Sequence, residues 1–374
     1  MEIKSERLLS LDVFRGITIA AMILVNNQGD WGHVYPALDH APWNGFTPTD
    51  AIFPFFLFIV GVTTAFSLHK RKERGDDQIK LIKKIFFRSS VLILLGIIKE
   101  NFPFFAWQEF QFTGVLQRIG IVYFFTALIF LKTSLRTQVI ITFAILFVYW
   151  GLMTLVPVPG IGYANLEQTT NLGAYLDRLL LGGHLNVKTK IWDPEGLLSS
   201  LPGIASSLSG VLLGHLLVSK IDESVKTIKM FIYGNFAILL ALLWNIWFPI
   251  NKNLWTSSFV LLSSGIALNV FALCYWFADI RKIRWWTKPF AVYGMNALFV
   301  YFISAIFGRI IKKLIFITND SNAVLNLKDF TFQSYIRPLF ESPFNASVAW
   351  AFLMVLFWLG ILWILYKKRI FIKI

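Results

Sequence analysis

The chain has 374 residues, of which 56% are apolar, 17% are aromatic and 15% are charged. Soluble domains contain nearly half apolar and about a quarter charged residues, so this composition excludes an ordinary soluble domain and favours a multi-pass membrane protein. The formal net charge of +14 does not indicate nucleic-acid binding, because the basic residues lie in short clusters between apolar runs and form no recognisable binding module.

Ten apolar stretches are each long enough to cross a bilayer core of about 30 Å, which needs about 20 mostly apolar residues per helix. We therefore predict an all-α, polytopic membrane helical bundle with about ten transmembrane helices, forming a single domain over residues 1–374. The polar start and the charges at Asp12 and Arg15 predict that the first span stays in the protein and is not cleaved as a signal peptide. The predicted spans are residues 9–26, 51–68, 82–98, 113–131, 138–155, 196–219, 228–248, 255–278, 289–310 and 346–365.

The Lys and Arg residues around these spans predict the orientation, since cytoplasmic loops carry the excess of basic residues. Counted on alternate sides, 24 fall on one side and 10 on the other. Both termini are therefore predicted to be cytoplasmic, with Lys4, Arg7 and Lys373 among the residues counted there. The opposite side receives outer loops near residues 27–50, 156–195 and 311–345. The second and third are long enough to fold as lids over a cavity.

The first outer loop gathers ionisable and aromatic residues at a membrane boundary. Its second half reads DHAPWNGFTPTD over residues 39–50. A histidine such as His40 can take up and return a proton near neutral pH, and Asp39 and Asp50 can fix its tautomer. Asp50 begins the second span, where a carboxylate can cap the helix. Helix capping and the orientation of His40 or a substrate both remain open roles for Asp50.

Three ionisable residues within the predicted spans stand out, because a charge there is costly unless it is paired or hydrated. Asp12 and Arg15 are three residues apart in the first span, so they can pair with each other or bind a ligand. Arg118 has no acidic residue within one turn and needs a partner on another helix or a ligand phosphate. A guanidinium group suits both needs, and Arg118 is therefore a candidate contact for a phosphate-bearing cofactor.

The other histidines and the cysteine offer no clear site. His33, His69, His184 and His215 lack the surroundings of His40 and are predicted to be structural. Cys274 is the one cysteine, so neither a disulfide framework nor a thiolate metal site can form, and we expect it to be buried. Without an H-E-x-x-H or C-x-x-C motif, we predict no metal.

Seven motifs follow one another through most of the chain. They are LLSLDVFRG (8–16), VN (25–26), HAPWNG (40–45) with Asp50, FPFFLFIVG (53–61), GVLQRIG (114–120), DPEG (193–196) and YGMNAL (293–298). In this order they resemble the heparan-alpha-glucosaminide N-acetyltransferase family of membrane acetyltransferases. The resemblance implies transfer of an acetyl group from cytoplasmic acetyl-coenzyme A to the amine of a terminal glucosamine, as in heparan sulfate, on the far side of the membrane.

The resemblance also assigns residues and a location. It places His40 at the family's active-site histidine and Asn26 at an asparagine close to it. The animal enzyme has a large lumenal N-terminal extension that we do not find here, which suggests a bacterial relative in the cytoplasmic (inner) membrane with the His40 loop facing the periplasm. A homodimer is a further expectation. We expect the segment between Asn26 and His40 to be a few residues longer than in the animal enzyme, which bears on acceptor preference.

The candidate residues fit acetyl transfer independently of the resemblance. A protonated sugar amine cannot attack a thioester, so a base must remove its proton while hydrogen-bond donors stabilise the oxyanion. His40 can be that base, or a nucleophile that carries the acetyl group itself. Asn26, Trp43 and Asn44 can supply donors, and Trp43 and Asn44 are also predicted to contact the acceptor. Two alternatives stay open: a small-solute or sugar transporter, and an O-acetyltransferase of a surface polysaccharide.

Overall fold

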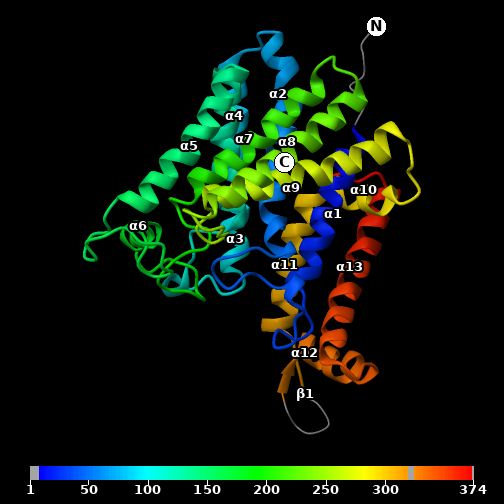
Figure 1. Cartoon of the computed structure of the whole chain (residues 1–374). Helices are drawn as coiled ribbons and strands as arrows, with labels where there is room; N and C mark the ends of the chain where they lie inside the picture. The colour runs from blue at the N-terminus through cyan, green and yellow to red at the C-terminus, as the bar shows by residue number, and fades with distance from the viewer. Residues whose placement is uncertain (1–7, 319–323, 373–374) are drawn as a thin grey trace. The chain divides into compact units, whose positions relative to one another are not determined.

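The computed structural model describes residues 8–318 and 324–372, and it is almost entirely helical (Figure 1). Lys4, Arg7 and Lys373, which contribute to the predicted orientation, lie outside the described residues. The longer helices are α1 (Leu9–Asn26), α2 (Ile52–Glu73), α3 (Gln78–Asn101), α4 (Val115–Lys132), α5 (Leu135–Leu155), α6 (Leu172–Leu181), α7 (Ser200–Val218), α8 (Glu223–Trp244), α9 (Ser257–Tyr275), α10 (Thr287–Met295), α11 (Ala297–Lys313) and α13 (Pro343–Lys367).

Short elements fill the connections. They are the helix α12 (Leu327–Thr331), the 3₁₀ turns η1 (Pro36–Leu38), η2 (Pro48–Ala51), η3 (Trp107–Glu109) and η6 (Arg337–Leu339), and the π turns η4 (Trp276–Ile280) and η5 (Phe332–Ile336). A small antiparallel hairpin of β1 (Phe316–Thr318) and β2 (Val324–Asn326) pairs Phe316 with Asn326. In Figure 1 this hairpin lies beside α12 at one end of α11. Each predicted outer loop therefore contains secondary structure of its own.

The prediction of a polytopic helical membrane protein is confirmed. Within the described residues, eight helices are long and apolar enough to cross a membrane, or nine spans if the bent pair α10–α11 counts as one. The predicted number of ten differs at α3, which is a helix of 24 residues but carries Lys80, Lys83, Lys84 and Arg88 in its first half. The ninth predicted span is broken between Met295 and Ala297, where the helix axis turns by 78°.

The chain forms two compact units. Unit 1 comprises Met1–His40, Thr47–Ile52 and Cys274–Ile374, and unit 2 comprises Ala41–Phe46 and Phe53–Leu273. The assignment of one transmembrane domain to the whole chain stays a prediction.

Unit 2 is built on close contacts between helices. A side-chain carbon at Gly61 of α2 would overlap the Ser207 carbonyl oxygen of α7, and one at Gly210 would overlap the carbonyl oxygen of Phe58. These glycines let the two backbones touch, as small residues do where membrane helices associate. The pairs α3–α4, α4–α7 and α5–α7 also pack side by side, around a core that includes Leu57, Val122, Ala205, Leu208 and Phe259.

Unit 1 joins the first helix to the last ones. A side-chain carbon at Gly16 of α1 would overlap the Phe290 carbonyl oxygen of α10, and one at Gly294 would overlap that of Asp12. Asp12 and Arg15 form the expected pair at 3.7 Å, and Arg15 also donates to the Gly294 carbonyl oxygen at 3.3 Å. The charges of α1 thus contribute to the contact with α10.

The break between α10 and α11 is occupied by Asn296. Its side-chain nitrogen Nδ2 donates to the Ile370 carbonyl oxygen at 3.1 Å, and its side-chain oxygen Oδ1 accepts from the Ile372 N–H at 2.9 Å. The side chain therefore satisfies backbone groups of the segment that follows α13, and it ties that segment to the bend between α10 and α11.

Candidate active site

His40 and Asp50 lie together in unit 1. The His40 ring atom Nδ1 is 2.7 Å from Asp50 Oδ1, and the Asp50 side chain is 1% exposed while that of His40 is 49% exposed. Asp50 sits in η2, whose start is a capping box: the other carboxylate oxygen, Oδ2, accepts from the Thr47 N–H at 3.0 Å and from the Thr47 hydroxyl at 3.2 Å. The turn that precedes α2 thus fixes the carboxylate against the imidazole.

This geometry selects the tautomer of His40. An ionised carboxylate only accepts hydrogen bonds, so the neutral imidazole carries its proton on Nδ1 and has its basic lone pair on Nε2. When Nε2 takes a proton, the buried carboxylate stabilises the resulting imidazolium. The loop around the pair is also tied together, because the Thr47 hydroxyl donates to the Asp39 carbonyl oxygen at 2.6 Å and the His40 N–H donates to Asp39 Oδ1 at 2.8 Å.

Three other candidate residues, Asn26, Trp43 and Asn44, lie in or next to the first outer loop. Asn26 is the last residue of α1 and is exposed, and it is not part of the His40–Asp50 pair. Trp43 and Asn44 belong to unit 2. The Trp43 indole N–H donates to the Leu166 carbonyl oxygen at 3.1 Å, and its ring meets Trp192 edge-on at 5.2 Å. Asn44 is exposed, and its side-chain oxygen accepts from Asn251 at 3.1 Å.

Arg118 is buried in unit 2 with 1% of its surface exposed. Its Nη2 donates to the Gly196 carbonyl oxygen at 3.1 Å and to the Ser199 hydroxyl. The guanidinium carbon lies 5.1 Å from the Trp255 ring centroid and 5.9 Å from that of Phe53. Its Nε and Nη1 atoms are buried without a hydrogen-bond partner among the described residues. Of the two roles left open by the sequence, these contacts support a tie between α4 and the start of α7.

Three carboxylates near Arg118 were not singled out from the sequence. Burial raises the pKa of Asp177 to about 6 and that of Glu195 to about 7, and burial also raises the pKa of Asp193, while Arg118 offsets part of each rise. Asp193 accepts from the Thr113 hydroxyl and from the Asn186 N–H. In the sequence, Asp193 and Glu195 stand out only as part of the DPEG motif, one of the motifs behind the family resemblance. The motif does not indicate which residues these carboxylates contact.

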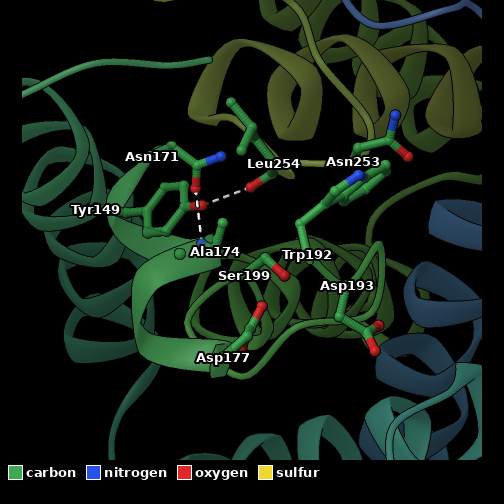
Figure 2. Close-up of a pocket in the computed structure, with 10 residues that line it drawn as sticks. Tyr149, Asn171, Ala174, Asp177, Trp192, Asp193, Ser199, Asn253 and Leu254 are labelled. Atoms are coloured by element: carbon green, nitrogen blue, oxygen red, sulfur yellow. Dashed lines mark hydrogen bonds between the residues drawn. The ribbon is translucent and has the colours of Figure 1, made fainter. Parts of the chain in front are cut away.

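A small cavity lies against this acidic group (Figure 2). Its volume of about 20 Å³ leaves room for about one ordered water. In Figure 2, Tyr149 and Asn171 lie on one side of the cavity, and Trp192 and Asn253 lie on the other. The cavity is lined by Tyr149, Asn171, Gly173, Ala174, Asp177, Trp192, Asp193, Ser199, Asn253 and Leu254.

The remaining histidines correct one prediction. His33 lies 2.7 Å from Asp30 and His69 lies 3.2 Å from Glu73, so the expectation that these two lack carboxylate neighbours is wrong. Both partners are close in sequence, three and four residues away, where a helical or turn spacing brings them together. Cys274 is buried, as expected. Within residues 8–318 and 324–372, no group of three or more His, Cys, Asp or Glu residues is placed to hold a metal ion.

Comparison with known sequences identifies relatives. The family described as "Heparan-alpha-glucosaminide N-acetyltransferase, catalytic" matches residues 7–243, which include all the candidate site residues. The chain is 30% identical to heparan-alpha-glucosaminide N-acetyltransferase of Homo sapiens over 98% of this chain and 60% of the human protein. The enzyme of the same name from Mus musculus is 31% identical over 79% of this chain and 53% of the mouse protein. The chain thus spans little more than half the length of these relatives.

Proposed function

We propose, because the chain belongs to the heparan-alpha-glucosaminide N-acetyltransferase catalytic family, that it transfers an acetyl group from cytoplasmic acetyl-coenzyme A to the amine of a glucosamine-type sugar on the extracytoplasmic side. The family is one of membrane N-acetyltransferases that use acetyl-coenzyme A. The observation that carries the proposal is the 2.7 Å contact between His40 and buried Asp50, which equips an exposed imidazole to act as a base.

The proposed chemistry begins at Nε2 of His40. The sugar amine in its neutral form attacks the carbonyl carbon of the thioester, and Nε2 takes the proton that the attacking nitrogen loses. The tetrahedral intermediate then collapses, the C–S bond breaks, and the proton held on Nε2 passes to the leaving sulfur of coenzyme A. Asp50 remains ionised throughout and stabilises the imidazolium. In the alternative sequence, Nε2 attacks the thioester carbonyl carbon first, the C–S bond breaks and coenzyme A leaves as the thiolate. The amine nitrogen then attacks the acetyl-imidazole, His40 leaves as the free imidazole, and the proton that the amine loses passes to the thiolate.

The acceptor contacts in this proposal are Trp43 and Asn44, with Asn26 as a hydrogen-bond donor to the developing oxyanion. Trp43 offers an aromatic face of the kind that packs against apolar surfaces of ligands, and Asn44 offers an amide. The indole N–H of Trp43 is already bonded to Leu166, so its ring and not its donor would face a sugar.

Arg118 as a contact for coenzyme A phosphates stays a prediction. Its 1% exposure and its bonds to Gly196 and Ser199 favour the structural role. No other basic residue is assigned to the donor.

The location and assembly belong to the same proposal: the bacterial inner membrane, both termini in the cytoplasm, the His40 loop in the periplasm, lipid around the spans, and a homodimer. Orientation is tested in a Cys274→Ser background with one new cysteine at a time. A cysteine at exposed Ala37 should react with a membrane-impermeant maleimide in intact cells, whereas one at exposed Arg74 should react only after lysis.

One experiment separates the proposal from its rivals. Purified protein in nanodiscs receives acetyl-coenzyme A and a panel of amino sugars and polysaccharides, and mass spectrometry locates the new acetyl group. Acetylation on nitrogen supports the proposal, and acetylation only on hydroxyl groups supports the O-acetyltransferase. The broken span α10–α11 is a feature that transporters also use. Uptake of unmodified labelled sugar into proteoliposomes, without acetylation, would therefore favour the transporter.

A further inference from the structure

The segment between α1 and His40 is held by residues from the far end of unit 1. Lys328 of α12 has a buried side chain, and its ammonium group donates to the Gly29 carbonyl oxygen, 299 residues away in the chain. The same ammonium nitrogen lies 3.1 Å from Asp329 Oδ1 and 5.3 Å from the Phe332 ring centroid. Phe332 also packs so closely on Gly29 that a side-chain carbon there would overlap the ring.

The buried position of Lys328 requires a reason, because removing an ammonium group from water is unfavourable unless charge and hydrogen bonds compensate. Asp329 provides an opposite charge, but its side chain is 40% exposed, so water screens part of that attraction. The Gly29 carbonyl and the face of Phe332 supply the remaining contacts. By contrast, Lys313 at the end of α11 is exposed, so burial of a lysine is not general in this part of the chain.

The same segment is fastened to the start of α13. The Gly29 N–H donates to the Ser347 carbonyl oxygen at 3.2 Å, and the Asp30 N–H donates to the Ser347 hydroxyl at 3.0 Å. Further along, the Tyr35 hydroxyl donates to Asn345 Oδ1 at 2.5 Å. Both backbone groups of Gly29 are therefore held by residues near the C-terminus, and we call this set of contacts around Gly29 the clamp.

We propose that Lys328 is a positioning residue for His40: by fixing Gly29 it sets where the chain leaves α1, and so where the imidazole meets the acceptor. This rests on the proposed function, in which His40 is the base. The other end of the segment is fixed where Asp50 contacts the imidazole and Thr47 bonds Asp39. All residues between Gly29 and His40 are among those that the structure describes, and the one helical element there is the short turn η1.

A misplaced base is costly in catalysis, since a displacement of about 1 Å can lower a rate by about 100-fold. Lys328→Met removes the donor and the charge while keeping a long side chain. We expect hydrogen exchange over residues 28–38 to become faster and kcat per folded protein to fall at least tenfold. The KM for acetyl-coenzyme A and the apparent pKa of the pH–rate profile should stay unchanged, because Asp50 still contacts His40.

Two variants serve as controls. Lys328→Arg can still donate to Gly29 and should restore most of the activity, and Lys313→Met makes the same replacement at an exposed site and should behave as wild type. Loss of folding alone would lower the melting temperature without changing exchange in this segment selectively. If Lys328→Met does not fold, Ser347→Ala removes a neighbouring contact of the clamp and should give smaller changes in the same direction.

Wild-type exchange over residues 28–38 in the folded variant, or faster exchange with an unchanged kcat, would overturn the proposal. If the wild-type protein acetylates no amino sugar, the proposed function fails instead. The clamp is then tested by the rate at which diethyl pyrocarbonate modifies His40, measured by peptide mass spectrometry. A rate that changes in Lys328→Met and returns in Lys328→Arg supports the clamp, and an unchanged rate refutes it.

Discussion

Asp50 Oδ1 lies 2.7 Å from Nδ1 of His40, while the rest of the same carboxylate closes the first turn before α2. Helix capping and orientation of the histidine, which the sequence presents as alternatives, therefore coincide in one side chain. The turn at the start of α2 therefore holds the carboxylate that orients the exposed imidazole. Under the proposed function, a change at Asp50 is therefore expected to alter both stability and chemistry, and experiment can separate the two effects.

The two roles of Asp50 separate in a pair of variants. Asp50→Asn removes the charge that stabilises a protonated His40, and kcat should fall on the order of 100-fold or more. Thr47→Ala weakens the capping box but leaves the carboxylate, so the free energy of unfolding should fall by about 1 kcal/mol with little change in kcat. Steady-state kinetics and thermal melts of both variants check this, and equal kcat in the two would mean that Asp50 only caps.

Removal of His40 should abolish acetyl transfer and leave a folded protein. Half of its side chain is exposed, so His40→Ala deletes few packing contacts. The control is His69→Ala, since His69 also contacts a carboxylate, Glu73, at the end of α2, and it should keep wild-type activity. Acetylation of glucosamine is measured after both proteins elute as single species, and full activity of His40→Ala refutes its assignment as base or nucleophile.

Arg118 should matter for stability before it matters for the donor. Arg118→Met removes the hydrogen bonds to Gly196 and Ser199 and the cation near buried Asp193 and Glu195, and loss of a hydrogen bond from a charged group costs about 1.5–3 kcal/mol. Arg136→Met, at an exposed position of α5, should cost almost nothing. Melting temperatures test the stability effect. Calorimetric titration with coenzyme A tests the phosphate role, which unchanged donor affinity in the folded variant would eliminate.

The acidic group predicts a stability that declines with rising pH. Asp177 and Glu195 have pKa values raised to about 6 and about 7, above the ordinary values of 3.8 and 4.5. The folded state therefore holds protons more tightly, and this stabilisation is complete below about pH 4 and is lost as the pH rises through 6 to 7. The melting temperature in detergent should be higher at pH 5 than at pH 8. Asp177→Asn should flatten the decline, and a rise with pH would contradict it.

The crossing of α2 and α7 predicts which glycines tolerate a methyl group. Gly61→Ala drives a carbon into the Ser207 carbonyl, and such overpacking costs about 1–3 kcal/mol. At Gly151, in α5, a side-chain carbon would meet no atom within 4 Å, so Gly151→Ala should be neutral or slightly stabilising. Parallel melts decide the point, and a Gly61→Ala protein as stable as wild type would mean that the helices separate at little cost.

The sequence predicts local features of this protein well. Long apolar runs locate the helices, since length and composition alone decide whether a segment can cross a bilayer. The pair of His40 and Asp50 is ten residues apart, with Pro48 between them, so a turn could be expected to bring them together. The break at Asn296 cannot be predicted in this way because the apolar run continues through it, and only the structure shows the bend and the bonds from the Asn296 side chain to Ile370 and Ile372.

Contacts across long stretches of chain lie beyond such reasoning. Thr113 meets Asp193 across 80 residues, and Lys328 meets Gly29 across 299. Neither pair has a spacing that a helix or a turn would produce, and each looks ordinary in its own loop. Periodicity reports what one element buries, whereas these partners are set by how separate elements pack. The spacing of residues in the sequence therefore does not predict that Asp177, Asp193 and Glu195 lie close to Arg118.

The division of unit 1 between the two ends of the chain has a consequence for biosynthesis. The helix made first, α1, packs on α10 and α13, which emerge more than 250 residues later. At ordinary rates of translation this delay lasts roughly ten seconds to a minute. During that time Asp12, Arg15 and Gly16 of α1 lack their final neighbours on α10, so the contacts with these neighbours can form only after the last helices have been made.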